Sequence, residues 1–140
     1  MELNIGIEDK IHLEVEPGKK LLLLDMDETL LHAATLNDIF DEQMYGMEAK
    51  PTFYTSFMDQ ENVIEIGVFL RPCLQELIQR VSPYYTMCIF TASERLYADA
   101  ILDQIDPTQQ IFKKRIYRNK CLKTALPNLS DSSISPKPQT

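Results

Sequence analysis

The chain has 140 residues, of which 44% are hydrophobic and 25% are charged, enough for one soluble domain with a modest core. The net charge of −7 argues against a general nucleic-acid-binding surface. The three cysteines form no C-x-x-C pair, which argues against a zinc site, and neither a secretory signal nor a membrane-spanning apolar run is present. We therefore expect a nuclear or cytoplasmic protein that is not secreted, with neither nucleic acid nor membrane as a direct partner.

The first half of the chain predicts strands joined by turns. Residues 11–15 alternate apolar and polar side chains, as in a half-exposed strand. Residues 20–24 form a short apolar run that is typical of a buried parallel strand covered on both faces. Residues 53–58 and 63–69 predict a β-hairpin with a four-residue loop, whereas residues 37–48 fit either a loop or a short helix.

The second half of the chain alternates predicted helices and strands. The spacing of leucine, isoleucine and valine predicts a helix over residues 72–81, opened by a proline. A short buried strand is predicted over residues 85–90 and a further strand over residues 111–117. Between them, residues 91–94 have the form of a capping box, which predicts a helix that runs to about Ile105. This alternation favours a parallel α/β sheet.

The character of the sequence changes after Cys121. Hydrophobic periodicity is lost, and serine and proline become frequent. We therefore divide the chain into an amino-terminal extension (residues 1–19), a domain (residues 20–121) and a disordered Ser/Pro-rich tail (residues 122–140).

Acidic side chains follow directly after the first apolar run, at Asp25 and Asp27. In a parallel α/β sheet, ligands bind beyond the carboxyl ends of the strands. Two neighbouring carboxylates repel each other unless a cation neutralises them, and Mg²⁺ is a hard cation that takes oxygen ligands. With Mg²⁺ present, one carboxylate can attack phosphorus and the other can transfer protons.

Structural roles are also open for these residues. The D-x-D spacing is common by chance, and the acids fit a turn that caps a helix starting near Thr29, with Glu28 favouring its N-terminus. Thr91 fits a helix N-cap, although a hydroxyl at a helix N-terminus is also what a phosphate would use.

Four ordered blocks resemble the carboxy-terminal-domain (CTD) phosphatases, a branch of the haloacid dehalogenase superfamily. The block DMDETLLH (residues 25–32) matches the signature D-x-D-E-T-L-x-H, and three further blocks follow: FLRPCLQELI (69–78), YTMCIFTASERLYADAILDQIDP (85–107) and IFKKRIYRNKC (111–121). The resemblance implies a haloacid-dehalogenase-like fold, in which helices flank a parallel sheet. The hairpin region between residues 53 and 69 would be an insertion that shapes substrate entry.

The resemblance also implies roles for individual residues. Asp25 would be the nucleophile, forming an aspartyl-phosphate, and a Mg²⁺ ligand. Asp27 would be the general acid and base, with its backbone carbonyl on the metal. Thr29 would support the loop, whereas Met26 and Thr91 would contact the phosphate. The implied substrate is a phosphoserine-containing protein, the repeated tail of RNA polymerase II being the best-known example in the family.

Two parts of the family pattern are not recognisable in this sequence. Family members place a lysine in a K-D pair after the position of Cys121, followed by a late D-D or D-N motif that completes the metal site. Here Lys120 and Lys123 lie outside that context, and Asp131 is the only acid that follows. We therefore expect a sheet that is incomplete on its C-terminal side, as in a truncated or alternatively ended product.

The sequence leaves two functional hypotheses open. The first is a Mg²⁺-dependent protein-serine phosphatase with weakened activity. The alternative is a catalytically inactive phosphatase-like module that binds phosphopeptides or another protein. A role in mitochondrial protein import, which some family members have, is a minor third hypothesis because the amino-terminal segment is acidic.

Overall fold

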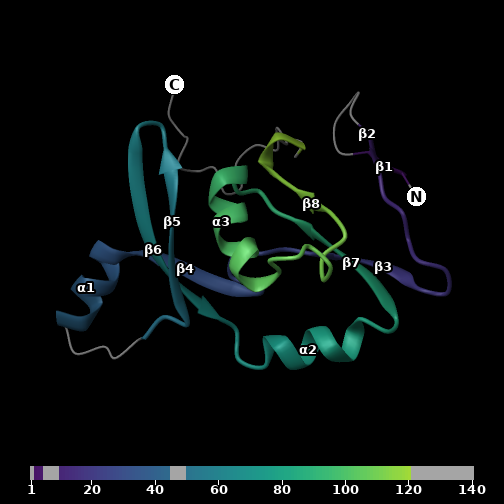
Figure 1. Ribbon diagram of the computed structural model, residues 1–140, viewed down its shortest axis with the longest axis horizontal. Helices are drawn as coiled ribbons and strands as arrows, with labels where there is room; N and C mark the ends of the chain where they lie inside the picture. Colours follow the sequence, from purple (N-terminus) through teal and green to yellow (C-terminus); the bar gives the residue numbers. More distant parts are fainter. Residues whose placement is uncertain (1, 5–9, 45–49, 121–140) are drawn as a thin grey trace, which may run out of the picture.

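The structure is a computed structural model that describes residues 2–4, 10–44 and 50–120. Its central sheet is parallel, which confirms the predicted α/β class (Figure 1). In sheet order the strands are β3 (Lys20–Leu24), β7 (Tyr85–Phe90) and β8 (Arg115–Ile116). The register pairs Leu24 with Ile89, so β3 and β7 deliver their following loops to the same edge of the sheet.

A second, antiparallel sheet contains the predicted hairpin. In sheet order its strands are β4 (Leu31–Thr35), β6 (Asn62–Leu70) and β5 (Phe53–Asp59). The loop is shorter than the four residues expected, because Asp59 pairs with Asn62 and leaves two residues between them. Gln60 closes that turn with a positive φ of 58°.

In the described part of the chain, three helices accompany these two sheets. They are α1 (Leu36–Met44), α2 (Leu74–Val81) and α3 (Arg95–Ile105), and a short 3-10 turn, η1 (Arg118–Lys120), ends the described chain. In Figure 1, α3 lies between the hairpin and the central sheet, and the Thr55 hydroxyl on β5 donates to the Ala100 carbonyl on α3 at 3.3 Å. No helix in the described part of the chain is long and apolar enough to cross a membrane.

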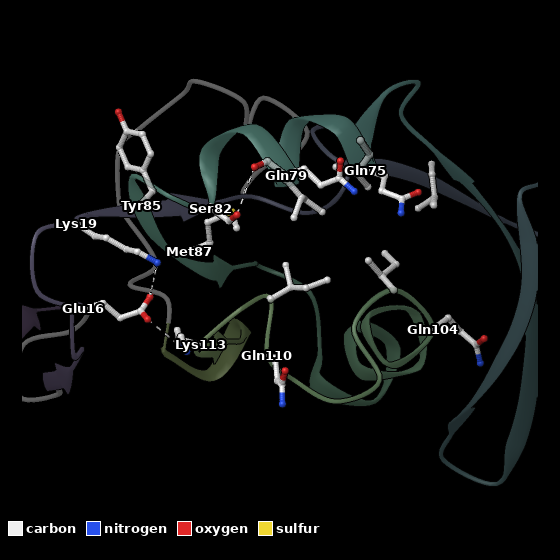
Figure 2. A pocket seen from close by; sticks show the side chains of 15 residues that line it. Glu16, Lys19, Gln75, Gln79, Ser82, Tyr85, Met87, Gln104, Gln110 and Lys113 are labelled. Carbon is white, nitrogen blue, oxygen red and sulfur yellow. Dashed lines mark hydrogen bonds and ion pairs between the residues drawn. The ribbon is translucent and has the colours of Figure 1, made fainter.

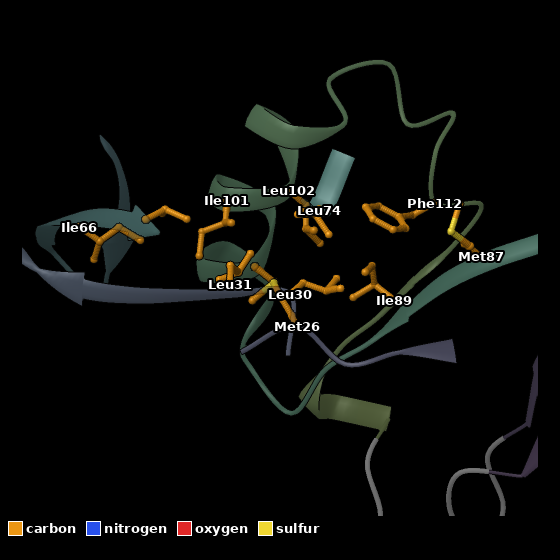
Figure 3. Packing of buried hydrophobic residues seen from close by; sticks show 12 residues of the cluster. Met26, Leu30, Leu31, Ile66, Leu74, Met87, Ile89, Ile101, Leu102 and Phe112 are labelled. Carbon is orange, nitrogen blue, oxygen red and sulfur yellow. The ribbon is translucent and has the colours of Figure 1, made fainter. Parts of the chain in front are cut away.

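The main core lies between α3, α2 and the central sheet (Figure 3). Ile101 and Leu102 of α3 are fully buried against Ile89 of β7, together with Met26 and Leu30 from the acidic loop. Because two residues of that loop are core residues, packing fixes the position of the backbone that carries the acids.

The amino-terminal extension contributes a second, smaller core. It contains β1 (Glu2–Asn4) and β2 (Lys10–His12), which pair antiparallel, so the predicted strand is shorter than residues 11–15. Ile11 and Leu13 are buried in one cluster with Cys88 and Ile116 of the central sheet. The extension thus packs on the domain that follows it.

β3 is less buried than expected. Leu22 and Leu24 pack against the main core, and Leu21 and Leu23 against the smaller cluster, so both faces are covered. All four leucines are nevertheless only half-buried. The reason is that β3 is an edge strand among the described strands, with only β7 beside it in this sheet.

The segment after the acidic loop is a strand, not the helix that the alternative interpretation of Thr29 required. β4 pairs antiparallel with β6, His32 standing opposite Phe69. Pairing with β6, almost forty positions later in the chain, overrides the local preference for a helix. A short window of sequence cannot reveal such a pairing.

The predicted strand over residues 111–117 is also wrong in its bounds. Asp106, which is 1% exposed, accepts backbone hydrogen bonds of 3.0–3.1 Å from Gln110, Ile111 and Phe112. The segment therefore wraps around a carboxylate first, and β8 spans only Arg115–Ile116. The Ser/Pro-rich tail predicted for residues 122–140 lies outside the described residues.

Candidate active site

The acidic loop leaves β3 at Leu24 and closes on itself before β4 begins. The Leu30 amide donates to the Met26 carbonyl at 2.9 Å, and the Glu28 amide donates to the Leu31 carbonyl at 2.7 Å. Glu28 has a positive φ of 63°, which makes the turn tight. Asp25 and Asp27 are thereby held at the carboxyl edge of the sheet.

Asp25 is exposed at the mouth of this loop. Its Oδ2 atom accepts a hydrogen bond of 3.1 Å from the Thr29 hydroxyl. A carboxylate has lone pairs beyond the one that this bond uses, and an exposed anionic oxygen can act as a nucleophile or a metal ligand. The structure thus gives Thr29 a contact that orients Asp25.

Asp27 is half-buried, and two hydroxyl groups hold its carboxylate. One comes from the turn after β7 and the other from α3. The Ser93 hydroxyl donates to Oδ2 at 2.6 Å, and the Tyr97 hydroxyl donates to Oδ1 at 2.7 Å. Neither residue was predicted from the sequence to belong to the site. Their contact with Asp27 depends on the pairing of β3 with β7, which brings the two following segments together.

Tyr97 is the most strongly perturbed side chain at this site. Burial raises its pKa, and the hydrogen bond to Asp27 and the carboxylate charge raise it further. Its ring also meets Phe57 of the hairpin edge to face, with 5.4 Å between centroids and an angle of 80°. The phenol is therefore a neutral hydrogen-bond donor throughout the physiological pH range.

Thr91 lies directly after β7, but it does not cap α3. The helix begins at Arg95, with Glu94 in the N-cap position and no side-chain cap, so the predicted capping box is wrong. Thr91 is 1% exposed, and its hydroxyl oxygen accepts from the Ser93 amide at 3.1 Å. This contact closes a tight turn before the helix, a local bond that competes with capping.

Met26 has no exposed side-chain surface and belongs to the main core. Its backbone carbonyl accepts from the Leu30 amide, and the predicted contact of Met26 with a phosphate stays a prediction. Glu28 points its carboxylate at the exposed ring of His32, with 2.6 Å between Oε1 and Nδ1.

Cationic groups near the acids are few in the described part of the chain. The Arg118 guanidinium donates to the Ala92 carbonyl at 2.8 Å, next to the turn that holds Thr91. Arg115 is 7% exposed and is engaged by Asp99 and Asp103. The side chain of Lys120, together with Lys123 and Asp131, lies outside the described residues.

The donor set fits a hard divalent cation. Asp25 offers an exposed carboxylate, and Mg²⁺ is bound in many phosphoryl-transfer sites by one or two carboxylates, water and the substrate phosphate. Among the described residues, no three histidine, cysteine or acidic side chains cluster closely enough to hold a metal by themselves.

One hollow adjoins the acidic loop, and a larger one lies away from it. A shallow pocket of about 300 Å³ adjoins the acidic loop and is lined by Glu28, His32, Phe69 and Arg71, among others. A cavity of about 630 Å³ lies between α2 and α3. It reaches Lys19 and Tyr85 at the opposite, amino-terminal ends of β3 and β7 (Figure 2). Neither Asp25 nor Asp27 is among the residues that line this cavity.

The fold and the paired acids define a haloacid-dehalogenase-like phosphatase domain. The family model for NLI interacting factor-like phosphatases matches residues 20–130, and the chain belongs to this family. The predicted membership of the CTD phosphatase family is thus confirmed. The family is generally Mg²⁺-dependent.

Curated relatives are similar over most of this chain. Phosphatase PSR1 of Saccharomyces cerevisiae is 32% identical over 108 residues, which are 77% of this chain and 23% of the relative. CTD small phosphatase-like protein 2 of Dictyostelium discoideum is 35% identical over 115 residues (81% and 18%). CTD nuclear envelope phosphatase 1B of Danio rerio is 29% identical over 116 residues (83% and 46%). The chain therefore spans less than half the length of these relatives.

Solved structures support the fold. The fission yeast RNA polymerase II CTD phosphatase Fcp1, in a variant bound to beryllium fluoride, superposes with a TM-score of 0.57 at 22% identity. The match covers 73% of this chain and 30% of that chain. At this identity the likeness shows the fold alone, and it confirms the predicted haloacid-dehalogenase-like class.

Proposed function

We propose that this chain is a Mg²⁺-dependent protein-serine phosphatase that acts through an aspartyl-phosphate. The observation that carries the proposal is the pair of differently held carboxylates at the end of β3. Asp25 is exposed and has one contact, from Thr29, whereas Asp27 is half-buried and has a donor on each oxygen. Different surroundings suit a nucleophile and a proton-transfer group.

The two carboxylates have different roles in the proposed reaction. An Asp25 oxygen attacks phosphorus, the bond between phosphorus and the serine oxygen breaks, and Asp27 gives its proton to that oxygen. In the second half, Asp27 removes a proton from a water molecule, which attacks the phosphorus of the aspartyl-phosphate and releases Asp25. Mg²⁺, when bound, would neutralise the charge that the phosphate brings beside Asp25.

The remaining site residues have supporting roles in this proposal. Thr29 orients Asp25 through the contact of 3.1 Å. Thr91, at the end of β7, would help to receive the phosphoryl group through its hydroxyl. Met26 contributes its backbone only.

The proposed substrate is a phosphoserine-containing protein segment. This proposal is supported by the family and by the similarity of the fold to Fcp1, an RNA polymerase II CTD phosphatase. The names of the nuclear envelope relatives favour a nuclear setting over a secreted one.

One observation favours a second function, that of a phosphopeptide-binding module without turnover. Among the described residues, no three histidine, cysteine or acidic side chains lie close enough together to hold a metal by themselves, so the acids of the β3 loop do not form a complete metal site. A missing metal ligand or cationic partner reduces stabilisation of the transition state more than it reduces binding.

Hydrolysis of a phosphoserine peptide by the 140-residue chain, with Mg²⁺ and with excess EDTA, separates the two functions. The phosphatase proposal predicts phosphate release that requires Mg²⁺ and disappears in Asp25→Asn. If the chain binds the peptide but releases no phosphate at any Mg²⁺ concentration, the binding function replaces it. Release that survives Asp25→Asn contradicts the mechanism.

A further inference from the structure

Two hydroxyl groups hold Asp27, and the roles described above do not account for them. We propose that Ser93 and Tyr97 are positioning residues, which fix the Asp27 carboxyl so that it can deliver a proton to a poor leaving group. This inference rests on the proposed phosphatase function. By holding Asp27, the two hydroxyls determine which phosphate esters the site can cleave.

The two hydrogen bonds fix the orientation of the Asp27 carboxyl group. Ser93 binds one oxygen of Asp27 and Tyr97 binds the other, at 2.6 and 2.7 Å. A carboxyl held at a single oxygen can turn about that contact, whereas one held at both oxygens has its plane fixed as well. Each oxygen keeps a second lone pair for the substrate.

The two donors are themselves fixed by separate elements. Ser93 lies in the turn after β7, where its amide donates to the Thr91 hydroxyl and its carbonyl accepts from the Arg118 amide at 3.0 Å. Tyr97 lies on α3, and its ring packs against Phe57 of the hairpin. Because packing and hydrogen bonds hold both donors, they can hold Asp27 to the tolerance that catalysis needs.

The chemical consequence depends on the leaving group. A serine oxygen leaves phosphorus as a strongly basic alkoxide unless it gains a proton as the bond breaks, so the position of Asp27 matters. A nitrophenolate is a weak base and leaves without a proton. Loss of the two hydroxyls must therefore slow serine phosphate cleavage far more than nitrophenyl phosphate cleavage.

The test compares kcat/KM for a phosphoserine peptide and for 4-nitrophenyl phosphate in Ser93→Ala, Tyr97→Phe and the double variant. This ratio reports the steps through loss of the leaving group and omits the shared hydrolysis of the aspartyl-phosphate. We expect each single variant to lose roughly tenfold on the peptide and less than about twofold on the nitrophenyl ester. Ser93→Thr, which keeps a hydroxyl, should restore the peptide activity.

Tyr117→Phe is the matched control. The Tyr117 hydroxyl also donates to an aspartate, Asp99 of α3, at 2.6 Å, but it does not touch Asp27. It should leave the ratio of the two kcat/KM values unchanged, and thermal unfolding of every variant reports any loss of stability. Equal losses on both substrates, with the wild type active, overturn the inference alone. A wild type without turnover on either substrate overturns the phosphatase proposal and the inference with it.

Discussion

The hydroxyl of Tyr97 donates a hydrogen bond of 2.7 Å to Asp27, seventy positions earlier in the chain. The bond joins α3 to the loop after β3, and it exists because β3 and β7 are parallel neighbours whose following segments meet at one edge. The same ring touches Phe57, so the hairpin, the helix and the acidic loop converge on one carboxyl group.

The contact between Thr29 and Asp25 leads to a first prediction. Thr29→Val removes the hydroxyl that orients the proposed nucleophile while keeping the shape of the side chain. A hydrogen bond of this kind is worth about 1 kcal/mol, so kcat on a phosphoserine peptide should fall roughly five- to tenfold. Thr29→Ser should keep most of the activity, and an unchanged kcat in the valine variant would show that Asp25 needs no such support.

Asp106 should be among the most important residues for stability. Asp106→Ala leaves the backbone amides of Gln110, Ile111 and Phe112 without their acceptor in a buried place, which should cost at least about 3 kcal/mol of unfolding free energy. Urea unfolding monitored by circular dichroism measures this. Asp106→Asn keeps one acceptor oxygen and should lose less. A cost below about 1 kcal/mol for alanine would mean that other acceptors replace the carboxylate.

Among the glycines of the described residues, Gly67 is the one whose lack of a side chain is required by close packing. A Cβ atom there would lie 2.6 Å from the end of Ile39 on α1 and 2.7 Å from the Pro51 ring. Gly67→Ala should therefore destabilise the domain by about 1–3 kcal/mol. Glu65→Ala on the same strand changes an exposed position and should alter stability by less than about 0.5 kcal/mol. Similar values for both variants would contradict the packing in this region.

Acid should remove the stabilisation contributed by Asp99. Burial alone would raise its pKa, but hydrogen bonds from Tyr117 and Arg115 outweigh burial and lower the pKa below its usual value. A lowered pKa in the folded state gives stability that is present above the unfolded value of about 4 and is lost as pH falls through the folded value. The difference in unfolding free energy between wild type and Asp99→Asn should hence shrink below about pH 4. A difference that stays constant to lower pH would contradict the assignment.

The sequence predicted the central strands because their apolar runs and bounding turns are local signals. The run at Lys20–Leu24, the strand Tyr85–Phe90 and the parallel arrangement follow from pattern alone. It did not predict β4, because that strand depends on pairing with β6. Nor did it predict the short β8, because a buried aspartate holds the preceding backbone away from the ladder.

The candidate site was predicted in part, for the same reason. Asp25 and Asp27 stand in one conspicuous loop, and Thr29 follows within it. Ser93 and Tyr97 carry no signal of their own, since serine and tyrosine near a helix start are common. Their role depends on which loop lies opposite, which only the register of β3 against β7 determines.

Chemical trapping of the aspartyl-phosphate tests the central claim most directly. The Asp27→Asn variant should form the intermediate but hydrolyse it slowly, because the group that activates water is missing. After reaction with 4-nitrophenyl phosphate, whose leaving group needs no proton from Asp27, and Mg²⁺, borohydride reduction converts a phosphorylated aspartate to homoserine, which mass spectrometry of the digested chain locates. We predict homoserine at residue 25 and none in the variant that also carries Asp25→Asn. Phosphate release by the wild type without any modification of residue 25, or with modification at another acid, would contradict the claim.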